Sequence, residues 1–143
     1  MPDTPKHSVS VAGIVVDDQN RVLLIQRRDN GHWEPPGGVL ELDETFEEGV
    51  KREVLEETGV HVEVERLTGV YKNMKRGIVA LVFRCSPTTG HPHKTIESAR
   101  VEWIESSKAE SMMSEAYAIR LTDAFTDACN IRNHDGTRLQ YLD

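Results

Sequence analysis

Cysteine is scarce in this chain, and long hydrophobic runs are absent. Cys85 and Cys129 are the two cysteines, too few for a disulfide framework, and neither has a partner at metal-ligand spacing. We expect both to be buried free thiols in a reducing cytosol. No apolar run approaches the roughly 18 residues of a membrane span, and the polar first residues lack the apolar core of a signal peptide. A cytoplasmic protein with no membrane partner is therefore expected.

Positive charge is also in the minority. The chain has 17 Lys and Arg against 24 Asp and Glu, so its formal net charge is −7 with His neutral. This charge opposes binding to nucleic acid, and an anionic ligand would need a metal ion and a few well-placed basic side chains. The 143 residues are expected to form one domain (1–143), with residues 1–7 and about 131–143 as flexible or edge segments.

The most informative segment that is present is acidic. Glu53, Glu56 and Glu57 are spaced i, i+3 and i+4, so a helix places them on one patch. Like charges at this spacing repel one another, and the negative C-terminal end of the helix dipole adds to the repulsion. A cation should compensate, and clustered carboxylate oxygens suit Mg²⁺ or Mn²⁺. The sequence therefore predicts a divalent-metal site.

The helix that carries this cluster has clear limits. Thr45 followed by Glu48 is typical of a capping box, with Asp43 as an alternative cap. Gly59 is typical of a left-handed stop at the C-terminal end. The side of this helix that should face the core is apolar in its first turns and acidic in its last turns. We therefore expect its acidic end to face a cleft.

A Pro/Gly-rich loop, residues 33–41, precedes this helix, and its glycines would let backbone atoms approach an ion or a phosphate closely. Read from Pro36-Gly37-Gly38 through Glu44, Arg52-Glu53-Val54 and Glu56-Glu57 to Gly59-Val60, loop and helix together resemble the Nudix box, every defining position of which is matched. The resemblance implies an α/β fold, the Nudix-type α/β/α sandwich with a mixed β-sheet between helices. It also implies an enzyme that hydrolyses a diphosphate bond in a nucleoside diphosphate linked to another group X. The matching residues are Pro36-Gly37-Gly38 as the lead-in and then Gly38-x5-Glu44-x7-Arg52-Glu53-Val54-x-Glu56-Glu57-x-Gly59-Val60.

The remaining elements follow from apolar periodicity and turn residues. Strands flanked by two helices agree with the sandwich that the resemblance implies. Strands are expected at 9–16, 21–27, 60–71, 78–85 and 99–104, a hairpin turn at 17–20, a loop at 87–92, a second helix at about 111–128 and a short edge strand at 138–142.

The resemblance also suggests a ligand set. By their positions in the box, Glu57 and Glu53 are the first expected metal ligands, and Glu56 shares their shell. A backbone carbonyl of Gly37 or Gly38 is expected to complete it. The expected cofactor is Mg²⁺, with Mn²⁺ as a substitute.

One carboxylate must deprotonate or orient the attacking water. Glu53 and Glu56 are candidates inside the box, and Glu97 is the third because a carboxylate of this later loop acts as ligand or base in some Nudix relatives. The sequence does not choose among the three. Arg52 completes the predicted catalytic set; we expect it to orient the acidic cluster, because Glu56 lies at i+4.

Substrate contacts are less strongly indicated. Arg27 and Arg28 end a strand that faces the loop, where they are expected to grip a phosphate, although two exposed charges closing a strand explain them equally well. Trp33 is expected to pack in the core rather than to stack on a base.

The substrate itself is left open. Some Nudix subgroups carry a marker proline or tyrosine about fifteen positions beyond the box, whereas residues 75–78 read Lys-Arg-Gly-Ile. A nucleoside triphosphate or another small nucleotide derivative is therefore the expected partner, and a homodimer is left open. The alternative function is a Nudix-like module that senses a nucleotide without cleaving it.

Overall fold

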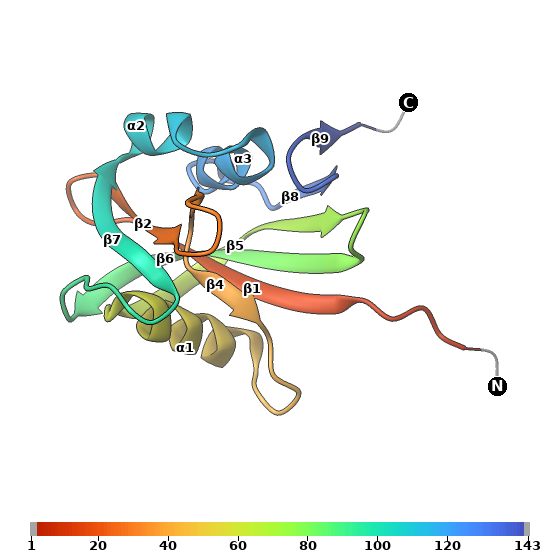
Figure 1. The fold of residues 1–143 in the computed structure, drawn as a ribbon, viewed down its shortest axis with the longest axis horizontal. Helices are drawn as coiled ribbons and strands as arrows, with labels where there is room; N and C mark the ends of the chain where they lie inside the picture. Colours follow the sequence, from red (N-terminus) through yellow and green to blue (C-terminus); the bar gives the residue numbers. More distant parts are fainter. Residues whose placement is uncertain (1–2, 142–143) are drawn as a thin grey trace.

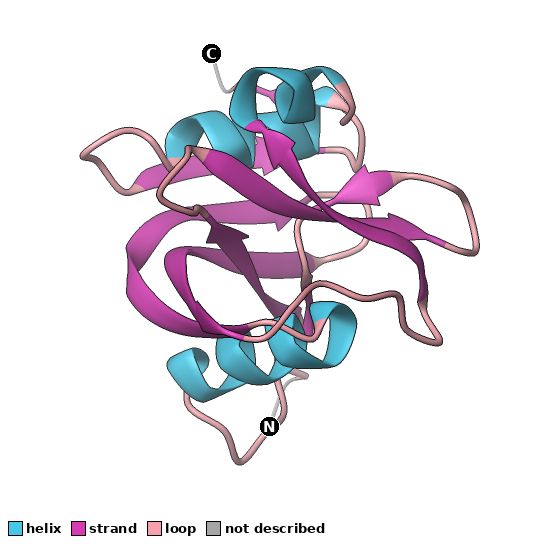
Figure 2. Ribbon diagram, turned by 90° about the vertical axis from the view of Figure 1, so that its left-hand side faces the viewer, coloured by secondary structure: helices cyan, strands magenta, loops and turns pink. Residues whose placement is uncertain are grey.

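The computed structural model describes residues 3–141, and within that range it contains nine strands and three helices. Figure 1 shows α1 on one side of the strands and α2 and α3 on the other, and Figure 2 shows the same layers from the side. None of the described helices is long and apolar enough to cross a membrane. The strands are β1 (Ser8–Val15), β2 (Arg21–Arg27), β3 (Trp33–Glu34), β4 (Gly37–Val39), β5 (His61–Asn73), β6 (Ile78–Thr89), β7 (Ser98–Glu105), β8 (Asn130–His134) and β9 (Leu139–Gln140), and the helices are α1 (Phe46–Thr58), α2 (Ser106–Ser111) and α3 (Glu115–Asp123).

The strands form a six-stranded mixed sheet, in the order β4-β1-β6-β5-β8-β9, and a three-stranded antiparallel sheet, in the order β3-β2-β7. In the larger sheet β1 runs parallel to β6 and β5 runs parallel to β8. The predicted mixed sheet between helices is thus confirmed. The predicted turn at 17–20 is present: the Asp17 N–H donates to the Arg21 carbonyl at 3.0 Å, and Val16 pairs with Val22 in antiparallel orientation. Beyond this turn the predicted hairpin does not continue, because β1 and β2 enter different sheets.

Strand β1 is buried on both faces, which explains why helices cover both sides. Val11 and Val15 point to the core under α1, where they pack with Val54. Ala12 and Ile14 point to the opposite core, under α2 and α3. This is the period-two alternation of a strand, and burying each Val or Ile side chain contributes about 1.5–3 kcal/mol.

The C-terminal third of the chain departs most from expectation. The helix predicted at about 111–128 is confirmed only in its middle, where α3 spans Glu115–Asp123. Helix α2 is a separate short helix that ends at Ser111, and residues 112–114 separate the two. Ser114 is in an extended conformation, with φ −66° and ψ 161°. At the other end of α3, Arg66 and Arg84 each donate to the carbonyl of Ala124, so tertiary contacts satisfy the end of the helix.

Other differences have tertiary causes as well. Strand β6 continues to Thr89, into the predicted loop, because β5 runs alongside it and pairs Thr89 with His61. The short strands β3, β4 and β8 were not predicted. Cys129 is exposed rather than buried, whereas Cys85 is buried as expected. A short edge strand is present as β9, within the predicted 138–142, of which residue 142 lies outside the described range.

Candidate active site

Helix α1 begins and ends as the sequence predicts. The Thr45 hydroxyl accepts from the Glu48 N–H at 3.2 Å, and the Glu48 carboxylate accepts from the Thr45 N–H at 2.8 Å, which completes the capping box. Gly59 ends the helix in the left-handed region at φ 81°. Its last turn contains no basic side chain. Because Val50 and Val54 are fully buried, the rotation of the helix, and with it the position of each acidic residue, is set by the core.

Glu57 is a buried carboxyl group. Its side chain accepts a hydrogen bond from the Gly37 N–H at 2.6 Å, and the residue is only 8% exposed. The pKa of Glu57 is raised to about 8, mainly by burial and in smaller part by the charges of Glu53 and Glu97. A negative charge at this position is therefore costly unless a cation lies close to it.

Gly37 and Gly38 allow the chain to pass very close to other atoms. A Cβ on Gly38 would lie 2.6 Å from the carboxyl carbon of Glu53, and a Cβ on Gly37 would lie 2.5 Å from the backbone oxygen of Val11. Any side chain at position 38 would thus displace the Glu53 carboxyl group. The contact seen at Gly37 is the amide that donates to Glu57, which the sequence did not predict; a carbonyl ligand from either glycine stays a prediction.

Arg52 holds three carboxylates of the box. Its guanidinium donates to Glu44 at 2.9 Å, to Glu53 at 2.8 Å and to Glu56 at 3.2 Å. The contact at i+4 is the predicted one, and the fold adds the other two. These bonds lower the pKa of Glu44 to about 2, whereas burial raises the pKa of Glu53 despite its bond to Arg52. Arg52 thus compensates the charges of Glu44, Glu53 and Glu56, whereas Glu57 bonds to the Gly37 amide and still lacks a positive charge.

The carboxylates of Glu53, Glu56 and Glu57 suit a hard divalent cation chemically, but they are not arranged to bind one together. Among residues 3–141, no three His, Cys, Asp or Glu side chains converge in a geometry for metal binding. Glu53 and Glu56 turn their oxygens to Arg52, while Glu57 lies on the other side near Gly37. Shared ligation by the three would require Glu53 and Glu56 to give up part of their contact with Arg52.

A cleft of about 410 Å³ opens beside Glu57. It is also lined by the two predicted phosphate-binding residues, Arg27 and Arg28, and by Glu97, a predicted general base. Arg27 is already paired there, with Asp29 at 2.7 Å and Glu34 at 3.1 Å. Arg28 instead donates to the Thr95 carbonyl. The cleft is lined by Ile25, Arg27, Arg28, Asp29, Glu57, Ile96 and Glu97.

A second hollow, of about 320 Å³, was not predicted. It is lined by the aromatic rings of Trp33 and Tyr117, by Glu34, and by residues of the turns before α3 and between β8 and β9. These segments are far apart in sequence, so only the fold brings them together. Trp33 packs against the core as expected, but it also faces this hollow. The hollow and the cleft lie close together, because Glu34 in β3 pairs with Ile25 in β2.

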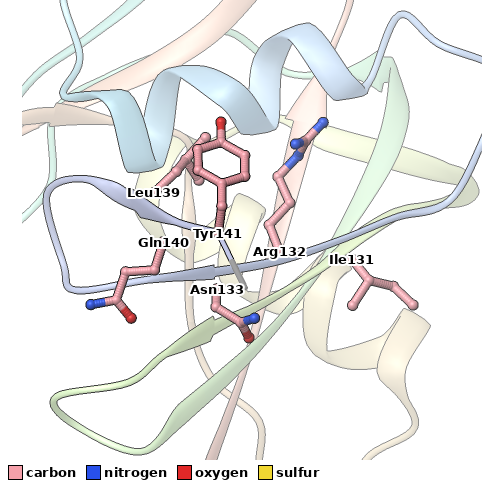
Figure 3. Close-up of a pocket in the computed structure, with 6 residues that line it drawn as sticks. All are labelled: Ile131, Arg132, Asn133, Leu139, Gln140 and Tyr141. Carbon is pink, nitrogen blue, oxygen red and sulfur yellow. The ribbon is translucent and has the colours of Figure 1, made fainter. Parts of the chain in front are cut away.

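Figure 3 shows a third hollow, of about 320 Å³, at the β8–β9 end of the larger sheet. Strand β4, which carries Gly37 and Gly38, lies at the opposite end of that sheet. No acidic side chain lines this hollow, and its one basic residue, Arg132, is paired with Asp123 at 2.7 Å. Its chemistry therefore offers no metal or catalytic site. The lining residues are Ile131, Arg132, Asn133, Leu139, Gln140 and Tyr141.

Comparisons with known proteins show the family of this chain. The NUDIX domain model matches residues 6–124, so the chain belongs to the Nudix family, and it is a Nudix hydrolase. It is 59% identical over 136 residues to a MutT-like protein of Streptomyces ambofaciens, covering 94% of this chain and 88% of that one. Nudix hydrolases act on small nucleotide substrates and generally use divalent metal ions.

Two further matches are less extensive. An ADP-ribose pyrophosphatase of Methanocaldococcus jannaschii is 42% identical over 83 residues, which cover 53% of this chain and 48% of that protein. The crystal structure of a NUDIX hydrolase from Nitrosomonas europaea superposes with a TM-score of 0.78 at 24% identity, covering 92% of this chain and 82% of that one. At this identity the structural match shows the fold alone.

Proposed function

We propose that this chain hydrolyses the diphosphate bond of a small nucleotide with the help of Mg²⁺, for which Mn²⁺ can substitute. The observation that carries this proposal is the buried Glu57 carboxyl group, which lies near Glu53 and Glu97 at the edge of a cleft. A cation beside it would remove the cost of its charge. The same cation would neutralise phosphate oxygens and activate water.

Different residues of the box would bind the cation and position its ligands. Glu57, Glu53 and Glu56 would hold the cation, with a backbone carbonyl of Gly37 or Gly38. Arg52 would hold Glu53 and Glu56 in place, since it already donates to both. Hard carboxylate oxygens in a partly buried site are what a small divalent ion prefers.

Glu97 is the proposed general base. Its side chain faces the cleft and has no hydrogen-bond or ion-pair partner among residues 3–141. Glu53, in contrast, is committed to Arg52, and Glu57 lies against Gly37. An exposed carboxylate that is free to turn can accept a proton from water and release it to solvent.

The nucleobase would enter the hollow between Trp33 and Tyr117. Aromatic rings offer stacking surfaces, and polar groups such as Glu34 beside them could bond to the edge of a base. The ion pair of Arg27 with Glu34 lies between the two sites, since Arg27 lines the cleft and Glu34 lines the hollow. A nucleoside triphosphate would thus place its phosphates beside Arg27 and its base at the rings.

A nucleotide panel tests the proposal. Nucleoside triphosphates, their deoxy forms and ADP-ribose are incubated with Mg²⁺ or Mn²⁺, and products are identified by mass spectrometry. Glu57→Gln should lower kcat by about 100-fold or more, whereas Glu47→Gln, on the exposed face of the same helix, should not. Equal activity of wild type and Glu57→Gln on every hydrolysed substrate would refute the proposed site.

The base hollow has its own test. Trp33→Ala and Tyr117→Ala should raise KM for the preferred nucleotide by about 10-fold, because stacking of a base on an aromatic ring is worth about 1–3 kcal/mol. The value of kcat should change much less. Unchanged KM in both variants would place the base elsewhere.

A further inference from the structure

Arg28 connects the cleft to the loop that carries Glu97. This loop, residues 90–97, contains no helix or strand and joins β6 to β7. The Arg28 N–H donates to the Glu97 carbonyl at 3.2 Å. Its guanidinium donates to the Thr95 carbonyl, from Nη2 at 3.1 Å. One residue directly after β2 therefore holds the loop at two carbonyl groups.

Few other contacts hold this part of the loop. The His93 N–H donates to the Thr58 carbonyl at the end of α1, at 2.9 Å, and in Figure 1 the loop passes next to α1 before it enters β7. Ser98 is fully buried at the start of β7. Between these two anchors, Ile96 is 93% exposed and contributes no packing. The order of residues 94–97 thus depends on Arg28.

The strand pairing nearby directs Glu97 to the cleft. Gln26 pairs with Arg100, but Arg27 pairs with Ser98, so β7 has one extra residue at this point. Such a bulge changes the direction of the side chains that follow it and is frequent beside active sites. Arg28 lies just past the bulge and continues the contact with the loop. Glu97 consequently lines the same cleft as Glu57.

We propose that Arg28 is a positioning residue whose guanidinium keeps Glu97 in the cleft by holding the Thr95 carbonyl group, beside the backbone bond from the Arg28 N–H to the Glu97 carbonyl. This inference rests on the proposed function, in which Glu97 accepts the proton of water. From the sequence, Arg28 was expected either to grip a phosphate, which would change KM, or to close a strand as an exposed charge. A residue that positions the base changes kcat instead, because it acts on the transition state more than on binding.

A double-mutant cycle separates these roles. Arg28→Ala and Glu97→Gln should each lower kcat by about 10- to 100-fold with little change in KM, and the double variant should be no slower than Glu97→Gln alone, since residues that act as one unit are not additive. A double variant with the product of both losses, or an Arg28→Ala variant that changes only KM, would overturn the proposal.

A second measurement does not depend on activity. Backbone ¹⁵N order parameters of residues 94–97, measured without nucleotide, should fall below about 0.6 in Arg28→Ala and stay near 0.85 in wild type. Arg27→Ala is the matched control, because Arg27 lines the same cleft but its side chain makes no contact with the Thr95 carbonyl; it should leave these values unchanged. Unchanged order in Arg28→Ala would overturn the proposal.

These two readouts also distinguish the inference from the proposed function. A wild-type protein that hydrolyses no nucleotide would reject the proposed function, and the order parameters would still decide whether Arg28 holds the loop. Arg28 is exposed, so the alanine variant should fold, as thermal unfolding will show. Arg28→Gln, which keeps part of the side chain's length, provides the same comparison if the alanine variant is unstable.

Discussion

Replacing Glu57 by Gln should stabilise the metal-free protein at neutral and alkaline pH. Burial raises the pKa of Glu57 from 4.5 to about 8 in the folded state. Between these two values the folded protein keeps a proton that the unfolded chain has released, so the stability falls as the pH rises. At 1.36 kcal/mol for each pH unit, this group alone removes about 4 kcal/mol of stability between pH 4 and pH 8. A glutamine avoids this loss, and its amide oxygen can still accept from the Gly37 N–H.

Urea unfolding in EDTA at pH 5, 6, 7 and 8 measures the effect. The wild-type free energy of unfolding should decrease over this range, and the Glu57→Gln curve should be much flatter. A smaller slope should remain, because burial also raises the pKa of Glu53. Glu47→Gln makes the same chemical change on the exposed face of α1 and should follow wild type. If the free energies of unfolding of wild type and Glu57→Gln decrease equally with pH, burial does not raise the pKa of Glu57 in the way proposed here.

Three further results are expected. Mg²⁺ or Mn²⁺ at about 100 times its Kd should stabilise wild type by about 2.7 kcal/mol, seen as a higher Tm, and Glu57→Gln by much less. Thr45→Ala removes the capping box and should lower the free energy of unfolding by about 1 kcal/mol in urea. Arg52→Gln leaves the carboxylates of Glu44 and Glu53 without their common partner and should cost about 2 kcal/mol in metal-free buffer, with part of the loss recovered when Mn²⁺ is added.

A different outcome would contradict each of these three predictions. An equal metal-induced rise of Tm in wild type and Glu57→Gln would place the ion elsewhere. A Thr45→Ala variant as stable as wild type would mean that tertiary packing alone holds the start of α1. An Arg52→Gln variant with unchanged stability would show that the carboxylates of the box do not need their cationic partner.

Local patterns in the sequence were sufficient to predict α1 and several strands. The capping box at Thr45 and the stop at Gly59 use neighbouring residues, so their geometry can be read from spacing. The limits of β2 follow from a run of β-branched and aliphatic residues in the same way. The C-terminal third was predicted less well, since the end of α3 is contacted by the distant side chains of Arg66 and Arg84.

The sequence by itself determined the family and the order of acidic groups along one helix, because helical spacing and caps act over three or four residues. Only the tertiary structure decided which other groups these acidic side chains contact. It turned Glu57 to the Gly37 amide, brought Arg28 to the loop of Glu97, and assembled the hollow of Trp33 and Tyr117. These contacts join segments that are 20 to 84 residues apart (57 − 37 and 117 − 33), and folding brings such segments together only when the two cores form on either side of β1.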